Sequence, residues 1–243
     1  TLPLPVGTYT VRALPLGPGY RGEQAVGVEI LADAQVGLDF ALQDAPRLLL
    51  VDADAWQSKS QLPYYQAMLD NLCYGYDTQA ITKPPLDIPD AALLAQYDLV
   101  IWSQPVTSPG YVGAWEELGS YLEQGGRLLL TGQDIGYWDV ELGGAPTEYA
   151  RYLHAEYQSE DGGLSALIGA DGSALEGLVL TYNTPDSAQN QVAPDAIAPG
   201  DGLAAGAMAS PAGVGAGLLV DACNYRAVYL GFGLEGMGPA AAR

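Results

Sequence analysis

The chain has 243 residues, 49% hydrophobic and 16% charged, which is enough for one large domain, or one large and one small, around a sizeable core. Nine lysines and arginines stand against 29 aspartates and glutamates, a net charge of −20. This charge excludes the basic surface that nucleic-acid binding needs and disfavours anionic membrane surfaces. No run of 18 apolar residues occurs, so we expect no membrane insertion.

The first 43 residues differ from the rest of the chain. Three short runs rich in valine, threonine, tyrosine and leucine, at 7–15, 24–31 and 34–42, are separated by turns that contain glycine or proline. This pattern predicts three β-strands. We therefore expect a β-rich segment over residues 1–43 and an α/β domain over residues 44–243.

From residue 47 onwards, strand and helix patterns alternate. The continuous apolar run RLLLVD at 47–52 is typical of a strand covered on both faces, and residues 62–72 have helical spacing. Further strands are predicted at 76–81, 97–103 and 127–132, with helices at 90–96, capped by Asp90, and at 108–126. The alternation predicts an α/β fold with a doubly wound, mostly parallel flavodoxin-like sheet.

Beyond residue 140 the pattern is weaker. It predicts a helix at 148–157, a strand at 175–183, a long loop at 193–217 and a hairpin at 216–232. The hairpin turns near residues 223–225. In a parallel sheet the end of the helix at 62–72 lies at the same edge as this turn, so Cys73 and Cys223 are expected to be neighbours. In an exported protein they would form a disulfide, and otherwise they are two free thiols.

Four segments are expected to end at the carboxyl edge of the predicted sheet, where α/β proteins bind ligands: VDADAW, WSQPVTS, TGQDIGYW and, if the last strand runs parallel, GFGLEG. Their order resembles the class I glutamine amidotransferase-like superfamily, whose active site contains Cys, His and Glu. GQDIG matches the nucleophile motif G-x-C-x-G with Asp134 in place of the cysteine. FGLE matches FHPE with Gly233 in place of the histidine, and only Glu235 is retained. Without a thiolate and an imidazole, the usual glutamine hydrolysis is excluded.

Two further resemblances concern the surroundings of this domain. GTYTVRA, GPGYRG and VGLDFAL resemble the last strands of a carboxypeptidase regulatory-like domain. The strings LLLTGQDIGYW, YLHAEY and YRAVYLGFGLE resemble a module of large exported bacterial proteins that also carry subtilisin-like peptidase domains. The resemblance implies an extracellular or cell-surface location, as a fragment of an exported chain whose other domains are its partners.

Carboxylates are the first candidates for chemistry. Asp134 and Glu235, with the single histidine His154, are candidate catalytic residues, and Asp52 and Asp54 are candidate ligands for Ca²⁺, the only cofactor considered. Asp134 has two alternative roles. It faces a ligand, or it bonds backbone amides of its own turn or caps the next helix, and the second role is favoured.

Aromatic residues offer a binding surface at the same edge. Eight lie in or near the strand-end loops: Trp56, Tyr64, Tyr65, Trp102, Tyr111, Trp115, Tyr137 and Trp138. Tyr65, Trp102 and Trp115 are expected in the core. Trp56, Tyr137 and Trp138, with Gln133, Asp52 and Asp54, are the candidate ligand-edge residues, suited to stacking on sugars or packing against a protein.

Three functions follow from these features. The favoured one is a non-catalytic binding or accessory module that recognises a protein or a carbohydrate. The alternative is a hydrolase, acting on carbohydrate or peptide, that uses the carboxylate pair of Asp134 and Glu235. The third is a structural spacer beside a peptidase.

Overall fold

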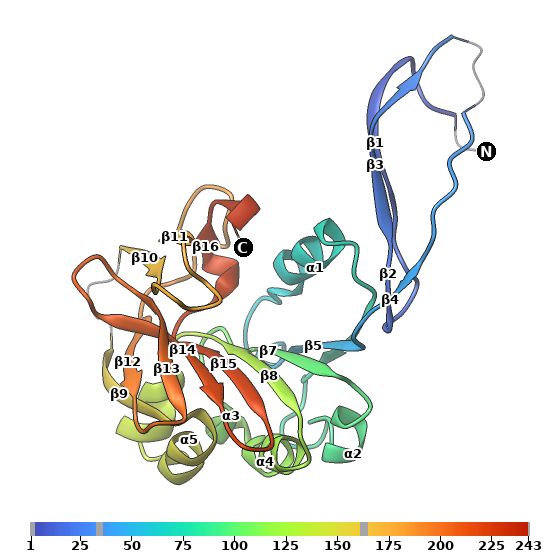
Figure 1. Cartoon of the computed structure of the whole chain (residues 1–243). Helices are drawn as coiled ribbons and strands as arrows, with labels where there is room; N and C mark the ends of the chain where they lie inside the picture. The colour runs from blue at the N-terminus through green and yellow to red at the C-terminus, as the bar shows by residue number, and fades with distance from the viewer. Residues whose placement is uncertain (1–2, 33–35, 161–164, 243) are drawn as a thin grey trace.

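The computed structural model describes residues 3–32, 36–160 and 165–242, and its centre is a ten-stranded mixed sheet (Figure 1). Five strands run parallel in the order β6, β5, β7, β8, β15, and the sheet continues antiparallel through β14, β13, β10, β11 and β16. The parallel strands are β5 (Leu48–Asp52), β6 (Tyr76–Ala80), β7 (Leu99–Ser103), β8 (Arg127–Thr131) and β15 (Arg226–Leu230). The others are β10 (Ala166–Gly169), β11 (Val179–Tyr182), β13 (Ala204–Ala209), β14 (Gly215–Asp221) and β16 (Met237–Gly238).

The sheet confirms the α/β class but is not mostly parallel. Parallel neighbours need a long crossover, usually a helix, and the chain supplies such connections only as far as β8. After α5 the described strands are joined by turns or loops without an α-helix, and in the large sheet they pair antiparallel, except that β15 pairs parallel with β8. The expected doubly wound pattern is therefore limited to the first half of the domain.

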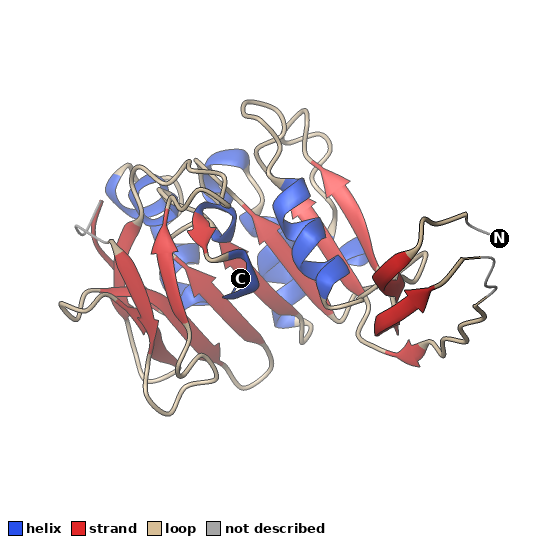
Figure 2. Ribbon diagram, turned by 90° about the horizontal axis from the view of Figure 1, so that it is seen from above, coloured by secondary structure: helices blue, strands red, loops and turns tan. Residues whose placement is uncertain are grey.

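Helices cover both faces of the parallel strands (Figure 2). α1 (Leu62–Asn71) lies on one face, where Leu48 and Leu50 pack with Tyr65. The other face carries α2 (Ala91–Leu94), α3 (Pro109–Val112), α4 (Trp115–Glu123) and α5 (Pro146–Leu153), where Leu49 and Val51 are buried. The strand alternation therefore assigns every side chain of β5 to one of two cores.

The N-terminal segment forms an arm that projects from the body of the domain (Figure 1). β1 (Gly7–Ala13) and β3 (Glu23–Ile30) make an antiparallel hairpin, and β2 (Tyr20–Arg21) pairs with β4 (Gln43–Asp44). The third predicted strand is wrong over residues 36–42, which have no strand structure, and residues 34–35 lie outside the described part. β2 also forms an antiparallel bridge between Arg21 and Tyr74, which joins the arm to the segment after α1.

Three helix and loop boundaries differ from expectation. Gly113, at φ 81°, ends α3 and splits the helix predicted at 108–126. His154, at φ 48°, ends α5, and the following residues form β9 (Ala155–Glu160), paired with β12 (Asp195–Pro199). The loop predicted at 193–217 is thus wrong, because it contains β12 and β13. Its alanine- and glycine-rich composition has low strand propensity, which pairing with neighbouring strands overrides.

Both cysteines are free thiols, so the predicted disulfide is wrong. Cys73 is buried beyond α1 and Cys223 is exposed in the β14–β15 turn. They lie at the same edge of the sheet, as expected, but β6 and β15 are four strand spacings apart, roughly 19 Å at about 4.8 Å each. A disulfide needs Cα atoms within about 7 Å.

Within the described residues, no helix has the length and apolar character needed to cross a membrane.

Candidate functional site

The turn after β8 has the shape of a nucleophile elbow. Asp134 stands at its apex with φ 60°, in the left-handed region that side chains rarely adopt. Two glycines make this turn possible. A Cβ at Gly132 would lie 1.8 Å from the carbonyl oxygen of Gln104, and one at Gly136 would lie 2.5 Å from Cδ2 of Tyr157. The elbow continues into the π-helix η1 (Tyr137–Glu141).

Asp195, not Asp134, binds the backbone of the elbow. Its carboxylate is fully buried and accepts a hydrogen bond from the Gly136 amide at 2.6 Å. Among the described residues, the buried Oδ1 of Asp134 has no hydrogen-bond partner. Burial, with a smaller contribution from the charge of Glu160, raises the pKa of Asp134 to about 6. Burial also holds the pKa of Asp195 well above its usual range, and the charge of Asp134 adds to this. The elbow therefore brings together two carboxyl groups whose pKa values are both raised.

Gln133 serves the fold rather than a ligand. Its side chain is fully buried, and its Oε1 accepts hydrogen bonds from the amides of Val192 at 2.7 Å and Ala193 at 2.9 Å. Its Nε2 donates to the carbonyl of Asn190 at 2.9 Å. These three bonds fasten the 190–193 segment to the elbow.

Glu235, in the 3₁₀-helix η2 (Leu234–Gly236), is also fully buried. Its carboxylate accepts hydrogen bonds from the Tyr65 hydroxyl at 2.7 Å and from Asn190 Nδ2 at 2.8 Å. Burial raises its pKa, which those hydrogen bonds partly oppose. A Cβ at Gly233 would lie only 2.1 Å from its Oε1. The carboxylate thus fills the space where a histidine side chain at position 233 would begin.

The two candidate catalytic carboxylates have different surroundings. Glu235 is held by α1 and the 190–191 loop, whereas the charged neighbours of Asp134 are Glu160 and Asp195. Among the described residues no hydrogen bond joins Asp134 to Glu235. Sequence reasoning missed Asp195, which lies in the stretch that was expected to be a loop.

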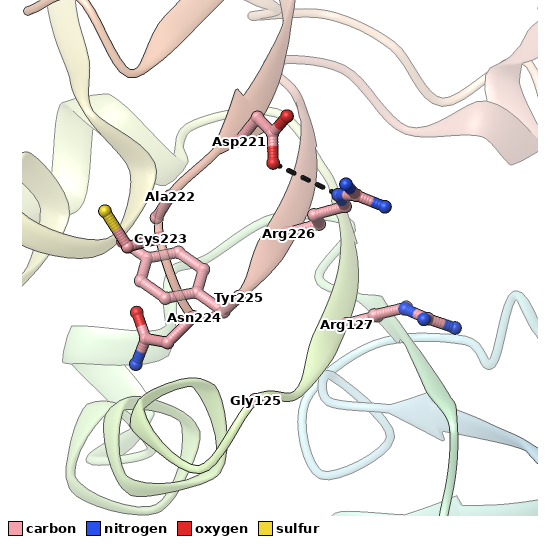
Figure 3. A pocket seen from close by; sticks show the side chains of 8 residues that line it. All are labelled: Gly125, Arg127, Asp221, Ala222, Cys223, Asn224, Tyr225 and Arg226. Carbon is pink, nitrogen blue, oxygen red and sulfur yellow. Dashed lines mark hydrogen bonds and ion pairs between the residues drawn. The ribbon is translucent and has the colours of Figure 1, made fainter.

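His154 has partners on both ring nitrogens. Nδ1 lies 2.7 Å from the carboxylate of Asp201, and Nε2 lies 2.9 Å from the hydroxyl of Tyr225. Because His154 ends α5 in the left-handed conformation, these contacts anchor the helix end to Asp201, between β12 and β13, and to Tyr225 in the β14–β15 turn. Close to this turn is a small pocket of about 190 Å³ lined by Gly125, Arg127 and residues 221–226, where Arg226 donates to Asp221 at 3.1 Å (Figure 3).

Asp54 links two strand-end loops. It is fully buried and accepts hydrogen bonds from the Thr107 hydroxyl at 2.6 Å and from the Val106 amide at 2.7 Å. Gln57 and Gln104 donate to it as well, at 3.2 and 3.3 Å. Burial raises its pKa despite these donors. The arrangement explains Asp54 as a tie between the loops that follow β5 and β7.

Asp52 lies in a row of polar side chains on the α1 face of the sheet. Asp52 pairs in register with Ser103, and Ser103 pairs in register with Thr131, so the three end neighbouring parallel strands side by side. All three are at most 1% exposed. The Tyr65 hydroxyl faces Ser103 and Thr131 and donates to Glu235. No group of three or more Asp, Glu, His or Cys side chains in the described residues is arranged to hold a metal ion.

Four aromatic rings form a continuous row at the carboxyl edge of the sheet. The ring centroids of Trp56 and Tyr111 are 6.2 Å apart, those of Tyr111 and Trp138 are 4.4 Å apart, and those of Trp138 and Tyr137 are 6.2 Å apart. Tyr111 is 49% exposed and the other three are partly exposed. We call these residues the aromatic row.

A groove of about 670 Å³ adjoins the aromatic row. It is lined by Trp56, Thr82, Lys83, Pro84, Pro85, Tyr111, Val112 and Gly113. Tyr65, Trp102 and Trp115 are buried, as expected for core residues. Tyr111 is one of the eight aromatic residues that the sequence places in or near the strand-end loops, but it is not among the candidate ligand-edge residues. Its place after the Ser-Pro-Gly helix start is the signal that could have found it.

No protein-family model and no curated protein matches this sequence. Several solved structures are similar to it, among them the following three. Exo-β-1,4-mannosidase Op5Man5 from Opitutaceae bacterium strain TAV5 has 15% identity and a TM-score of 0.51 over 77% of this chain and 31% of its own. A candidate GMP synthase subunit from Thermoplasma acidophilum has 14% identity and a TM-score of 0.50, over 80% of this chain and 87% of its own. A ThuA-like protein from Bacteroides uniformis has 13% identity and a TM-score of 0.50, over 79% of this chain and 82% of its own.

These likenesses concern the fold alone, because the identities are low. They agree with an amidotransferase-like α/β domain in the sense of a shared fold. The chain spans about a third of the mannosidase it resembles.

Proposed function

We propose that this chain is a non-catalytic, carbohydrate-binding accessory domain. The observation that carries the proposal is the aromatic row beside the groove at the carboxyl edge of the sheet. Partly exposed aromatic rings are flat apolar platforms with polar edges, and they suit the apolar faces of sugar rings. Lys83, in the lining of the groove, adds an ammonium donor for sugar hydroxyls, and the Thr82 hydroxyl, which donates to Asp87, can accept a hydrogen bond from them.

The residues that stand at the elbow support a binding function without catalysis. Asp134 stands where an amidotransferase-like enzyme has its cysteine, and the carboxylate of Glu235 takes the space of the histidine. One observation favours the hydrolase alternative, namely the pKa of about 6 at Asp134, which suits an acid or base. Glu235 is not its partner in that case, because its carboxylate is enclosed by Tyr65 and Asn190.

The setting of the domain is part of the proposal. We expect it to act outside the cell, as one part of an exported chain, next to other domains that include a peptidase. The net charge of −20 keeps such a domain soluble and away from anionic surfaces. Identification of the full-length gene product with its flanking domains is the direct test of this setting.

Binding is tested by calorimetry with soluble oligosaccharides, beginning with β-1,4-linked manno-oligosaccharides because the mannosidase named above acts on that linkage by its name. Trp56→Ala and Tyr111→Ala should each weaken binding at least about tenfold, equivalent to about 1.4 kcal/mol. Tyr20→Ala is the matched control, because Tyr20 on the arm is 48% exposed and Tyr111 is 49% exposed. The proposal fails if no oligosaccharide binds, or if the control weakens binding as much.

A second readout separates binding from hydrolysis. The same oligosaccharides are incubated with the protein and the reducing ends are counted. Binding without new reducing ends supports the proposal. Cleavage that disappears in Asp134→Asn would replace it with the hydrolase alternative.

A further inference from the structure

Asp52 is a buried carboxylate without a hydrogen-bond donor. Its side chain is 1% exposed, and neither of its oxygens has a partner in the described residues. Its neighbour Asp54 is equally buried but accepts bonds from four protein donors. Placing a carboxylate in the interior without donors is strongly unfavourable unless a positive charge accompanies it. The contrast between the two aspartates therefore singles out Asp52.

The surroundings of Asp52 are rich in oxygen. Ser103 lies beside it in register on β7 and is 1% exposed, and its hydroxyl faces that of Tyr65. Parallel strands are about 4.8 Å apart, so two such side chains on the same face can share one ligand. Thr131 and the Tyr65 hydroxyl continue the row of oxygens on the far side of Ser103.

Negative charge is concentrated around this row. Asp52, Asp54 and Glu235 are all at most 1% exposed. The charge of Asp52 helps to raise the pKa of Asp54, and the charge of Asp54 helps to raise the pKa of Glu235. None of the three ion pairs recorded for the described residues involves Asp52 or Asp54. A ligand at Asp52 should therefore be positive, and carboxylate and hydroxyl oxygens are the donors that hard cations prefer.

We infer that the Asp52 carboxylate and the Ser103 hydroxyl bind a small hard cation, Na⁺ or Ca²⁺, at the carboxyl ends of β5 and β7. The site differs from the pair first expected, because the oxygens of Asp54 are occupied by its loop donors. The proposed cation site has a single carboxylate ligand, unlike a metal site that is built from three acidic side chains. It lies on the α1 face and is independent of the aromatic row.

The test is thermal unfolding of the whole chain at constant ionic strength in choline chloride, with NaCl or CaCl₂ replacing part of the choline. One of the two cations should raise the melting temperature in a saturable way, by roughly 3–6 °C at ten times its dissociation constant. Asp52→Asn should abolish the rise. Asp171→Asn, which removes one exposed charge, should keep it.

A second variant guards against a folding defect in Asp52→Asn. Ser103→Ala keeps the carboxylate and should shift the saturation midpoint to several-fold higher cation concentration. Equal melting temperatures in all three salts would overturn the inference. It is also overturned if Asp52→Asn, or Ser103→Ala, responds to the cation as the unaltered chain does, since the cation then binds elsewhere.

Discussion

Asp139 links the elbow to the aromatic row, and its titration predicts how stability depends on pH. It is fully buried in η1 and accepts hydrogen bonds from the Ser108 hydroxyl and from Trp115 Nε1, each at 2.7 Å. Ser108 caps α3, the helix that carries Tyr111. Burial nevertheless raises the pKa of Asp139 from 3.8 to about 6.

A raised pKa means that the folded state holds the proton more tightly than the unfolded state. The resulting stability is fully present below about pH 4 and is lost as the pH rises through about 6. At about 1.4 kcal/mol per tenfold difference in proton affinity, a pKa raised from 3.8 to about 6 corresponds to about 3 kcal/mol. Of this, about 2 kcal/mol is lost between pH 4.5 and 7.5.

The assay is urea unfolding of the unaltered chain and of Asp139→Asn at pH 4.5 and 7.5. Other buried carboxyl groups lose stability over the same range in both proteins, so the difference between the two pH-dependent losses isolates Asp139. We expect the variant to lose about 2 kcal/mol less than the unaltered chain. Equal losses in the two proteins would refute the reasoning, whatever the absolute stability of the variant.

Three further predictions concern the elbow, the histidine position and the thiols. Gly233→Ala should destabilise the fold by at least about 1–3 kcal/mol in urea unfolding, because its Cβ meets the carboxylate of Glu235, and a tolerated substitution would contradict that contact. Asp134→Gly should stabilise the chain by about 1 kcal/mol, since it relieves a left-handed conformation and a buried unpartnered oxygen; a lower melting temperature would count against this. In the native protein a thiol reagent should label Cys223 and spare Cys73 until unfolding, and rapid labelling of both would be inconsistent with the burial of Cys73.

The parallel half of the fold was readable from sequence because its signals are local. RLLLVD is apolar on both faces, and Asp90 caps its helix, with Leu93 donating to its carboxylate at 2.7 Å. Residues 193–217 carry no such signal. Their small side chains have no strong preference, and only pairing with β9 and β14 makes them strands.

The residues of the candidate site likewise fall into those that the sequence predicts and those that it does not. The elbow at Asp134 was predicted because two glycines bracket a turn after an apolar strand, and its positive φ confirms the shape. The role of Asp195 could not be predicted, since its bond to Gly136 joins residues 59 positions apart. The packing of Glu235 beneath Gly233 was likewise invisible, because it depends on where Tyr65 and Asn190 lie in space.

The central claim is that the aromatic row binds carbohydrate, and tryptophan fluorescence tests it most directly. Of the four tryptophans, Trp102 and Trp115 are buried, whereas Trp56 and Trp138 belong to the row. A bound oligosaccharide should change the emission of the unaltered chain in a saturable manner, and Trp56→Ala should both reduce the change and raise the dissociation constant at least about tenfold. Emission that no oligosaccharide alters, or an unchanged dissociation constant in Trp56→Ala, would contradict the account.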